Sequence, residues 1–293
     1  MSNVPMTKKQ HYVPRYYLKN FTDRNGFLHV YQRDKLRFNK SRPEDICYKD
    51  FLYETRWEDA DPRLGEFILP NQIEKSLSEL ESSHNALLKK IIMITCDPHN
   101  KNALICNSDE KKELALFTIS MFIRNPWALS RFKFDVIPVG MMDNPEIRTI
   151  EQCLKHINVG KVEPVIKAGI KKALLTNAPG GMMTQIATQL QNLHMCFLVA
   201  DDSSFVTSNF PVVFETYEIE EAHSVLSNVL IPLCPQVALQ YSNDPVVKPY
   251  HNRCVLLKSK YVSTLNKHFT NGGIDQYRMI ISHSDRFLHS LFA

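Results

Sequence analysis

The sequence predicts an α+β fold in which a central helical block packs against a mixed, mostly antiparallel sheet built from N- and C-terminal strands. Two observations lead to this prediction. Apolar residues recur at the helical period through the middle of the chain, over about residues 70–195. Short β-branched and aromatic runs, separated by turn residues, stand before this block and again over about residues 196–259. We therefore expect a single domain that spans residues 1–293.

The composition is typical of a soluble globular protein. The chain has 293 residues, of which 44% are hydrophobic and 23% are charged. No apolar run approaches the roughly 18 residues that a membrane span requires. The first residues also lack the apolar core of a signal peptide. We therefore expect a cytoplasmic protein that does not associate with a membrane.

The cysteines and the net charge exclude several classes of site. The 7 cysteines include no Cys-x-x-Cys pair, so we expect neither a zinc ribbon nor a disulfide framework, but buried and reduced thiols. The formal net charge of +4 is compatible with a polyanionic ligand without requiring one. No phosphate-cradling glycine loop and no metal-ligand cluster stands out. The sequence therefore predicts no metal site and no cofactor.

The most distinctive stretch is Gln10–Phe21, which is rich in aromatic and cationic side chains. Pro14 suits the first turn of a helix and disfavours helix just before it. We therefore expect a short helix after Pro14, and an extended segment carrying His11 before it. Helical spacing gives this helix an apolar face and a cationic edge. The apolar face consists of Tyr17, Leu18 and Phe21, and the edge of Arg15 and Lys19.

Short strands are expected between this helix and the helical block. Residues 27–32 and 35–40 have the pattern of a hairpin. One helical turn is expected at residues 43–46, and a third short strand at residues 50–54. Residues 55–65 are charged and broken by proline, which predicts a loop.

The clearest single element is a long helix from Asn71 to about Thr95, with apolar residues at a 3.6-residue period. Asn71 followed by Glu74 three positions later is typical of a capping box. His84 falls on the apolar stripe, so we expect it in the core. Further helices are expected from Ser108 to the Arg124-Asn125-Pro126 segment, where the proline ends the helix, and over residues 145–157, 162–175 and 182–193.

Beyond Met195 the chain becomes rich in strands. The expected strands are residues 196–200, 205–208, 212–215, 229–233 and 237–241. Prolines in this region should stand at strand ends or on a sheet edge, because they cannot donate to a ladder. Helices over residues 260–269 and 285–293, with a segment over residues 274–281 between them, close the predicted fold.

At residues 10–21 the pattern Gln-His-Tyr-Val-Pro-Arg-x-Tyr-Leu-Lys-Asn-Phe resembles the signature of a bacterial family, the domain of unknown function 4238. Residues 73–91, 124–126, 205–212 and 230–233 resemble later parts of the same pattern. The resemblance implies no assigned activity. It does imply Thr-Ser-Asp-Asn-Pro within the segment of residues 205–212, whereas this chain has Asn209 where the aspartate is expected.

Residues of the opening stretch predict a phosphate-directed site. A histidine such as His11 can move a proton from a ribose hydroxyl or a water molecule near neutral pH. Arg15, Lys19 and Arg124 could stabilise the charge that develops on the phosphate, without a metal ion. Tyr12, Tyr16 and Tyr17 could stack on unpaired bases. The alternative is structural: Arg15 pairs with an acid, and the aromatic side chains belong to the core, namely Tyr16, Tyr17 and Phe21.

The strand end at Thr207, Ser208 and Asn209 presents three hydrogen-bonding side chains, which we predict to contact the substrate. Such short polar residues can also satisfy turn backbone instead.

Two functions stay open from the sequence. The first is a metal-independent, nuclease-like or phosphoester-directed effector, which binds nucleic acid or another phosphorylated ligand. Its base is His11, and Arg15 and Arg124 stabilise charge. The second is a non-enzymatic binding or scaffold module that works with a partner protein, for which the missing aspartate at Asn209 argues. The sequence does not decide whether the protein is an enzyme.

Overall fold

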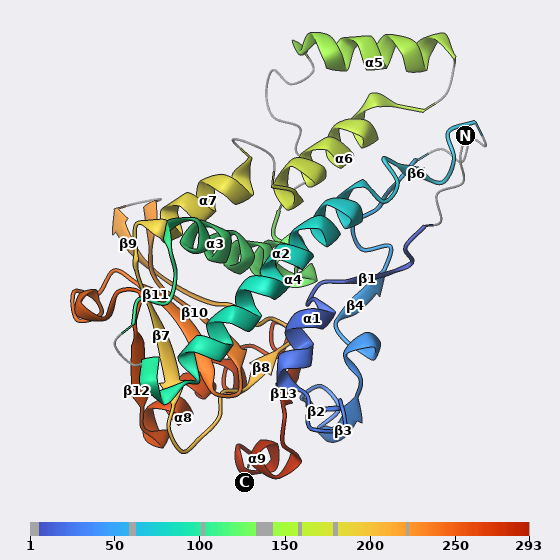
Figure 1. Cartoon of the computed structure of the whole chain (residues 1–293). Helices are drawn as coiled ribbons and strands as arrows, with labels where there is room; N and C mark the ends of the chain where they lie inside the picture. The colour runs from blue at the N-terminus through green and yellow to red at the C-terminus, as the bar shows by residue number, and fades with distance from the viewer. Residues whose placement is uncertain are drawn as a thin grey trace.

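A computed structural model describes residues 6–58, 63–100, 103–132, 143–157, 160–177, 181–220 and 223–292 (Figure 1). The order of elements confirms the α+β class, with helices concentrated in the middle of the chain and mostly antiparallel sheets built from its two ends. None of the helices in these ranges combines the length and the apolar character needed to cross a lipid bilayer.

The opening stretch folds as predicted, into a strand followed by a short helix. Strand β1 (Lys9–His11) pairs antiparallel with β4 (Tyr48–Asp50). Pro14 precedes helix α1 (Arg15–Leu18), which tightens into the 3₁₀ helix η1 (Lys19–Phe21). The predicted apolar face is fully buried. Both cations of the predicted edge, Arg15 and Lys19, are exposed.

The predicted hairpin is formed by β2 (Leu28–Gln32) and β3 (Arg37–Ser41), and the predicted helical turn by η2 (Pro43–Asp45). The predicted strand at residues 50–54 is wrong, because Phe51 has a φ of 52° and the chain turns there after β4 ends. The predicted loop at residues 55–65 contains strand β5 (Thr55–Arg56), which pairs with β6 (Phe67–Ile68). Residues 59–62 lie outside the described residues.

The long predicted helix is α2 (Gln72–Thr95), but its start differs from the prediction. Asn71 has a φ of 59°, and its side chain makes no capping hydrogen bond to the helix. Asn71 Oδ1 instead accepts a 3.0 Å hydrogen bond from the backbone N–H of Thr7. The predicted capping box between Asn71 and Glu74 is therefore wrong. His84 is 1% exposed, as expected for a core histidine.

The second long helix, α3 (Ser108–Ile123), does begin with a capping box, between Asn107 and Glu110. It ends where the proline predicted, and Asn125 then caps the short helix α4 (Pro126–Leu129). The 3₁₀ helix η3 (Pro98–Asn100) stands between α2 and α3. The other predicted helices of the block are α5 (Pro145–His156), α6 (Val162–Leu175) and α7 (Met182–Gln191).

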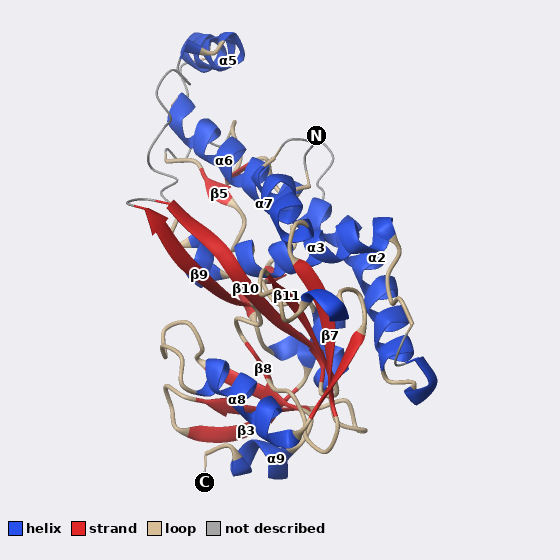
Figure 2. Cartoon of the chain, turned by 90° about the vertical axis from the view of Figure 1, so that its left-hand side faces the viewer, coloured by secondary structure: helices blue, strands red, loops and turns tan. Residues whose placement is uncertain are grey.

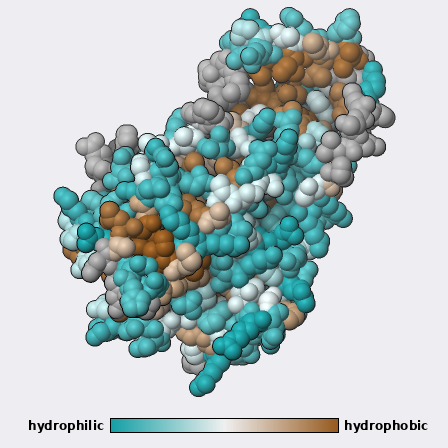
Figure 3. Space-filling model, in the orientation of Figure 1, coloured by the Kyte–Doolittle hydropathy of each residue, from teal (hydrophilic) through white to brown (hydrophobic). Residues whose placement is uncertain are grey.

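Helices α5 and α6 share a small core of their own. Leu154, Val162 and Ile166 are buried in it, and Trp57 and Leu64 pack against it from outside the two helices. Figure 3 shows apolar side chains gathered between these two helices, while the surface along α2 is largely hydrophilic. The helical block therefore extends away from the main core at this end (Figure 1).

The larger sheet of the described residues has the strand order β12-β7-β11-β10-β9 (Figure 2). All neighbours in it are antiparallel except β12 and β7. Its strands are β7 (His194–Ala200), β9 (Val213–Glu220), β10 (His223–Cys234), β11 (Val237–Ser242) and β12 (Cys254–Leu257). Pro232 stands opposite Ala238 of β11 and beyond the last residue that β9 pairs, so its missing N–H breaks no hydrogen bond to β9.

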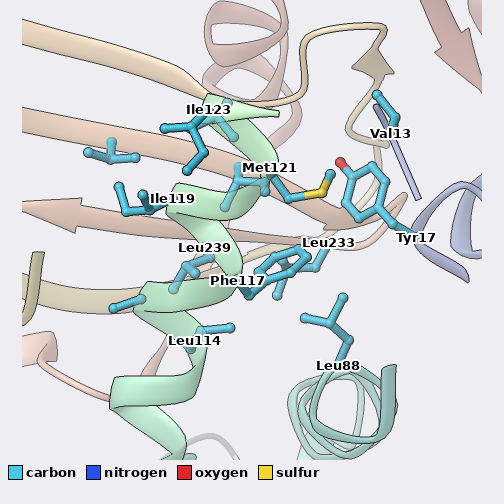
Figure 4. Close-up of a cluster of buried hydrophobic side chains, with 14 of the residues drawn as sticks. Val13, Tyr17, Leu88, Leu114, Phe117, Ile119, Met121, Ile123, Leu233 and Leu239 are labelled. Carbon is cyan, nitrogen blue, oxygen red and sulfur yellow. The ribbon is translucent and has the colours of Figure 1, made fainter. Parts of the chain in front are cut away.

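Alternate residues of this sheet face two different cores, as strand geometry requires. Phe197 and Leu239 face the main core between the sheet and the helices α2 and α3. Leu198 and Ala238 face a second core on the other side. Figure 4 shows Leu88 from α2, Phe117 from α3 and Leu233 from β10 meeting in the main core.

A second sheet joins the two ends of the chain, with the strand order β3-β2-β13-β8 among the described residues. Strand β13 (Met279–Ser282) pairs antiparallel with β2 on one side and with β8 (Thr207–Ser208) on the other. Helices α8 (Ser259–Thr270) and α9 (Asp285–Ser290) lie beside this sheet (Figure 2), and the 3₁₀ helix η5 (Lys248–Tyr250) precedes β12. Strand β8 also contacts the opening stretch, because Thr207 Oγ1 is hydrogen bonded to the hydroxyl of Tyr17 at 2.8 Å.

The cysteines divide into two groups that the sequence did not separate. Cys47, Cys106, Cys196 and Cys234 are buried, as predicted. Cys96 and Cys153 are exposed, so the prediction of buried thiols is wrong for these two.

Candidate functional site

A buried arginine ties the first strand to the helical block. Arg124 is 2% exposed and stands directly after α3. Its Nη2 donates a 2.6 Å hydrogen bond to the backbone carbonyl of His11, and its Nη1 donates a 2.9 Å hydrogen bond to Glu81 Oε1. Its Nε donates to the hydroxyl of Tyr53 at 3.3 Å. The guanidinium is therefore engaged on all three nitrogens.

This geometry brings Arg124 and His11 together, as the sequence predicts, but through the backbone of His11. A guanidinium that is enclosed and already paired with Glu81 has no free edge for a substrate. Its effect on the site is to fix the position of β1 and to hold Glu81. Arg124 is thus placed as a positioning residue.

His11 lines a cleft of about 400 Å³, which we call the His11 cleft. Two cations line it as well, Lys9 just before the opening stretch and Arg15 within it. Four carboxylates face them, and these are Glu44, Asp45, Glu74 and Glu81. Glu74 and Glu81 come from one face of α2, because they stand seven residues apart in the helix. The cleft therefore mixes both signs of charge, with carboxylates in excess.

The imidazole of His11 is held in its neutral form. Burial lowers its pKa below the usual 6.5, and the nearby charge of Arg15 lowers it further. The backbone of Glu44 and the carboxylate of Glu81 act in the opposite direction. Its Nε2 is buried and has no hydrogen-bond partner among the described residues. A neutral imidazole with an unused nitrogen is equipped to accept a proton.

The carboxyl group of Glu74 is shifted toward its protonated form. Burial raises its pKa from 4.5 to about 7, against the charge of Arg124, and the carboxylates of Glu81 and Glu54 add to the rise. Its Oε2 is buried without a hydrogen-bond partner in the part of the chain that the structure describes. Near neutral pH this side chain can therefore donate a proton.

Tyr12, the residue after His11, is 8% exposed and lines a different cleft of about 250 Å³. Burial raises the pKa of its phenol well above the usual range, so the phenol stays protonated. The same cleft contains Asn125 and Asn209, so three segments of the predicted family pattern meet there. Trp127 adds an aromatic side chain.

A neighbouring cleft of about 360 Å³ shares Lys49, Pro126 and Ser130 with the Tyr12 cleft, so the two are continuous. Most charged residues along them are cations. We call this surface the basic groove, and its cations are Lys49, Lys167, Lys171 and Arg278, with Asp275 as its carboxylate. Lys171 Nζ already donates to the backbone carbonyls of Leu52 and Glu54.

The remaining predicted substrate contacts do not reach the His11 cleft. Lys19 is exposed on η1 and is not in the lining of any of these clefts. Thr207 and Ser208 are 0% exposed. Thr207 Oγ1 is hydrogen bonded to the hydroxyl of Tyr17 at 2.8 Å, and Ser208 Oγ donates to the carbonyl of Phe210 at 2.7 Å. The structure corrects the prediction that they face a ligand, because their hydroxyls satisfy groups inside the protein.

Asn209 connects three parts of the chain through hydrogen bonds. Its Nδ2 donates a 2.9 Å hydrogen bond to the carbonyl of Gln276, and its Oδ1 accepts a 2.8 Å bond from the N–H of Met279. Its own carbonyl accepts a 2.6 Å bond from Asn125 Nδ2. The side chain thus uses both a donor and an acceptor on β13 and the turn before it.

Sequence reasoning missed the acidic side of the His11 cleft. The signal was present, because Glu74, Ser78 and Glu81 follow the helical period along one face of α2. The spacing of Asn71 and Glu74 instead assigns Glu74 to a predicted capping box, which the structure does not form. Within the described ranges, no cluster of three or more histidine, cysteine, aspartate or glutamate side chains is arranged to hold a metal ion.

Comparison with known proteins gives one match. Neither the curated proteins nor the solved structures contain a significant match to the chain. The model of the family described as "Protein of unknown function (DUF4238)" matches residues 9–286. This span covers the opening stretch, the Arg124-Asn125-Pro126 segment and Asn209. The chain therefore belongs to the DUF4238 family of proteins of unknown function.

Proposed function

We propose that this protein is a metal-independent, nuclease-like enzyme that acts on phosphoesters, with its active site in the His11 cleft. The single observation that carries the proposal is the pair His11 and Glu74. The two side chains line one cleft, their pKa values are shifted in opposite directions, each in favour of the uncharged form, and each keeps a buried atom without a partner among the described residues. Such a pair is the usual equipment of general acid–base catalysis.

In this mechanism neutral His11 is the general base. It removes the proton from the attacking hydroxyl, either of a ribose or of a water molecule, as that oxygen bonds to phosphorus. Protonated Glu74 is the general acid and gives its proton to the oxygen that leaves. Arg15 and Lys9 bind the non-bridging phosphate oxygens and stabilise their charge as the reaction proceeds. Arg124 positions His11 and Glu81 and does not contact the substrate.

The charge of the His11 cleft limits the class of substrates that can bind. Four carboxylates line it beside two cations, so a long polyanion would be repelled by the acidic wall. One phosphate can bind Arg15 and Lys9, while carboxylates such as Glu44 and Asp45 accept hydrogen bonds from sugar hydroxyls or base amines. The substrate class that fits best is therefore a nucleotide-sized phosphoester.

The test is a hydrolysis assay in the presence of EDTA with a panel of phosphoesters. The panel contains p-nitrophenyl phosphate, bis-p-nitrophenyl phosphate, 2′,3′-cyclic nucleotides and short RNA. We expect His11→Ala and Glu74→Gln each to lower kcat about 100-fold or more. The matched controls are His99→Ala and Glu79→Gln, since both residues are exposed and Glu79 shares α2 with Glu74. Full activity in folded His11→Ala, or no turnover of any panel member by the parent protein, would overturn the proposal.

The second candidate is a non-enzymatic binding or scaffold module that works with a partner. The observation that favours it is the basic groove, where cations outnumber carboxylates around Trp127. An acidic segment of a partner protein or a phosphorylated ligand suits such a groove. Anisotropy measurements with a labelled acidic peptide and a labelled RNA test it. Lys49→Glu with Arg278→Glu should abolish binding, whereas His11→Ala should leave it unchanged.

A further inference from the structure

A pocket of about 180 Å³ lies at the start of α3 and shares no lining residue with the His11 cleft or the basic groove. Side chains from α3, the end of α7, β7, β11 and the residue after η5 line it. We call it the α3 pocket, and its lining includes Lys111, Leu190, Leu193, Met195, Tyr241 and His251. None of the lining side chains is a carboxylate.

The positive charge of the α3 pocket comes from Lys111. The two acids that precede Lys111 in α3 are paired with other lysines. Glu110 is paired with Lys90, and Asp109 is paired with Lys112 at 3.0 Å. Lys111 itself forms no ion pair within the part of the chain that the structure describes. Its ammonium group is therefore available to an anion from outside.

His251 adds a neutral hydrogen-bond donor. Its Nδ1 accepts a 3.2 Å hydrogen bond from the backbone N–H of Met195, so the ring carries its proton on Nε2. Burial lowers the pKa of His251 below the usual 6.5, and the nearby charges of Lys111 and His194 lower it further. At neutral pH the imidazole can therefore donate one hydrogen bond from Nε2 without adding a second charge.

Tyr241 brings a buried hydroxyl group to the pocket. The residue is 2% exposed, and its hydroxyl has no hydrogen-bond partner among the described residues. Thr118 faces this hydroxyl from α3, but the Thr118 hydroxyl donates to the carbonyl of Leu114 at 2.8 Å. Burial raises the pKa of Tyr241, so the phenol keeps its proton. Buried donors are rarely left unused, and a ligand oxygen would supply the acceptor that this phenol lacks.

An apolar wall faces these donors. It consists of Leu190, Leu193 and Met195, and two of these residues, Leu190 and Met195, are at most 2% exposed. A cavity of about 150 Å³ is large enough for a benzene ring. The pocket therefore has room for one ring-sized apolar group that carries a small charged group. A dianion such as inorganic phosphate would exceed the single positive charge and would leave the apolar wall uncovered.

We propose that the α3 pocket binds a small organic monocarboxylate whose apolar part is about the size of one ring. The carboxylate accepts hydrogen bonds from the ammonium of Lys111, from Nε2 of His251 and from the hydroxyl of Tyr241, while the apolar part packs on the leucine and methionine wall. This inference does not depend on the function proposed for the His11 cleft.

The test is isothermal titration calorimetry of the purified full chain with benzoate, cyclohexanecarboxylate and isobutyrate at neutral pH. We expect saturable binding of one site per chain, with benzoate as the reference probe. Benzamide has nearly the same shape as benzoate but no charge, so it should bind about tenfold more weakly or worse. Inorganic phosphate should not displace benzoate.

Variants of the donors test their roles. Lys111→Met should weaken benzoate binding about tenfold or more, because the carboxylate loses its counter-charge. Lys112→Met, at the exposed neighbouring lysine, is the matched control and should bind like the parent. Tyr241→Phe removes the hydroxyl alone and should weaken binding about tenfold. In the parent, benzoate should also shift the amide resonance of Met195, whose N–H donates to His251.

Four results would overturn the proposal. They are a parent protein that binds no carboxylate of the panel saturably, unchanged affinity in Lys111→Met, displacement of benzoate by phosphate, and loss of benzoate binding in Lys49→Glu with Arg278→Glu. The last result would place the carboxylate in the basic groove instead. Lys111 is partly exposed on the surface of α3, so its variant decides the question even if Tyr241→Phe folds poorly.

Discussion

The backbone carbonyl of His11 accepts a hydrogen bond of 2.6 Å from Nη2 of Arg124, across a separation of 113 residues. The same guanidinium pairs with Glu81. Strand β1 is therefore held by a charge that is itself neutralised within the protein. This relationship makes the His11 cleft depend on a residue that does not line it.

We expect Arg124→Met to lower the free energy of unfolding by about 3 kcal/mol, because Glu81 and the carbonyl of His11 lose their donor together. Chemical denaturation measures the difference. Arg286→Ala, at an exposed position, should change stability by less than about 0.5 kcal/mol. A change of that small size in Arg124→Met would contradict the role assigned to the guanidinium.

The hydroxyl of Tyr17 connects the opening stretch to the sheets. It donates to the carbonyl of Pro232 at 2.6 Å and is paired with Thr207 Oγ1 at 2.8 Å. Tyr17→Phe leaves both partners buried without it, so we expect a loss of about 1–3 kcal/mol in the free energy of unfolding. Tyr261→Phe, at a 52% exposed residue, is the matched control and should be close to neutral. Equal stability of the two variants would argue against this anchor.

Asn209→Asp tests the residue that departs from the expected family pattern. A carboxylate still accepts from Met279 but repels the carbonyl of Gln276, so the variant should lose about 1–3 kcal/mol at pH 7. Repulsion raises the pKa of the new carboxyl group in the folded state. The loss in free energy of unfolding should therefore grow as pH rises and the carboxyl group ionises, and it should shrink at acidic pH. Thermal melting at several pH values measures this.

Asn271→Asp, at an exposed asparagine, is the control for that series. If Asn209→Asp instead gains a phosphoester hydrolysis that the parent lacks, the parent is a degenerate enzyme. The binding module then becomes the better interpretation of the chain.

The raised pKa of Glu74 predicts a pH dependence of stability. The folded state holds a proton on Glu74 up to about pH 7, whereas the unfolded chain releases it near 4.5. Between these values the folded state binds more protons, so the stability of the parent falls as pH rises, on the order of 2 kcal/mol.

Glu74→Gln removes this titrating carboxyl group. The difference in free energy of unfolding between parent and variant should therefore change between pH 4.5 and about 7 and be constant outside this window. Glu79→Gln, exposed on the same helix, should follow the parent at every pH. A parallel course of the Glu74→Gln and parent curves from pH 4.5 to 7 would show that Glu74 titrates normally in the folded state.

Local signals in the sequence predicted most elements. The proline after Asn125 ends α3 because the residue before a proline disfavours helix, and the hairpin β2–β3 follows from its alternating pattern. Such signals act between neighbours in the chain. These signals predicted the bounds of the helices in the middle block to within a few residues.

Long-range contacts were not predictable in the same way. Thr207 looked available because the sequence does not show that Tyr17, 190 residues earlier, covers its hydroxyl. Asparagine is a common residue type at helix N-caps, but the side chain of Asn71 instead accepts a hydrogen bond from the backbone N–H of Thr7. For the site, the sequence indicated His11 and its cations, whereas the acidic wall required the orientation of α2.

Strand β13 lies between β2 and β8, next to the hairpin β2–β3. Among the described strands it is the last in the chain, so the ribosome makes it last. During translation the inner edge of that hairpin has no native partner while the whole helical block is synthesised. Unpaired edges of this kind recruit other chains. A stalled or truncated product that stops before Met279 would therefore expose an adhesive edge, and its fate would be self-association or proteolysis.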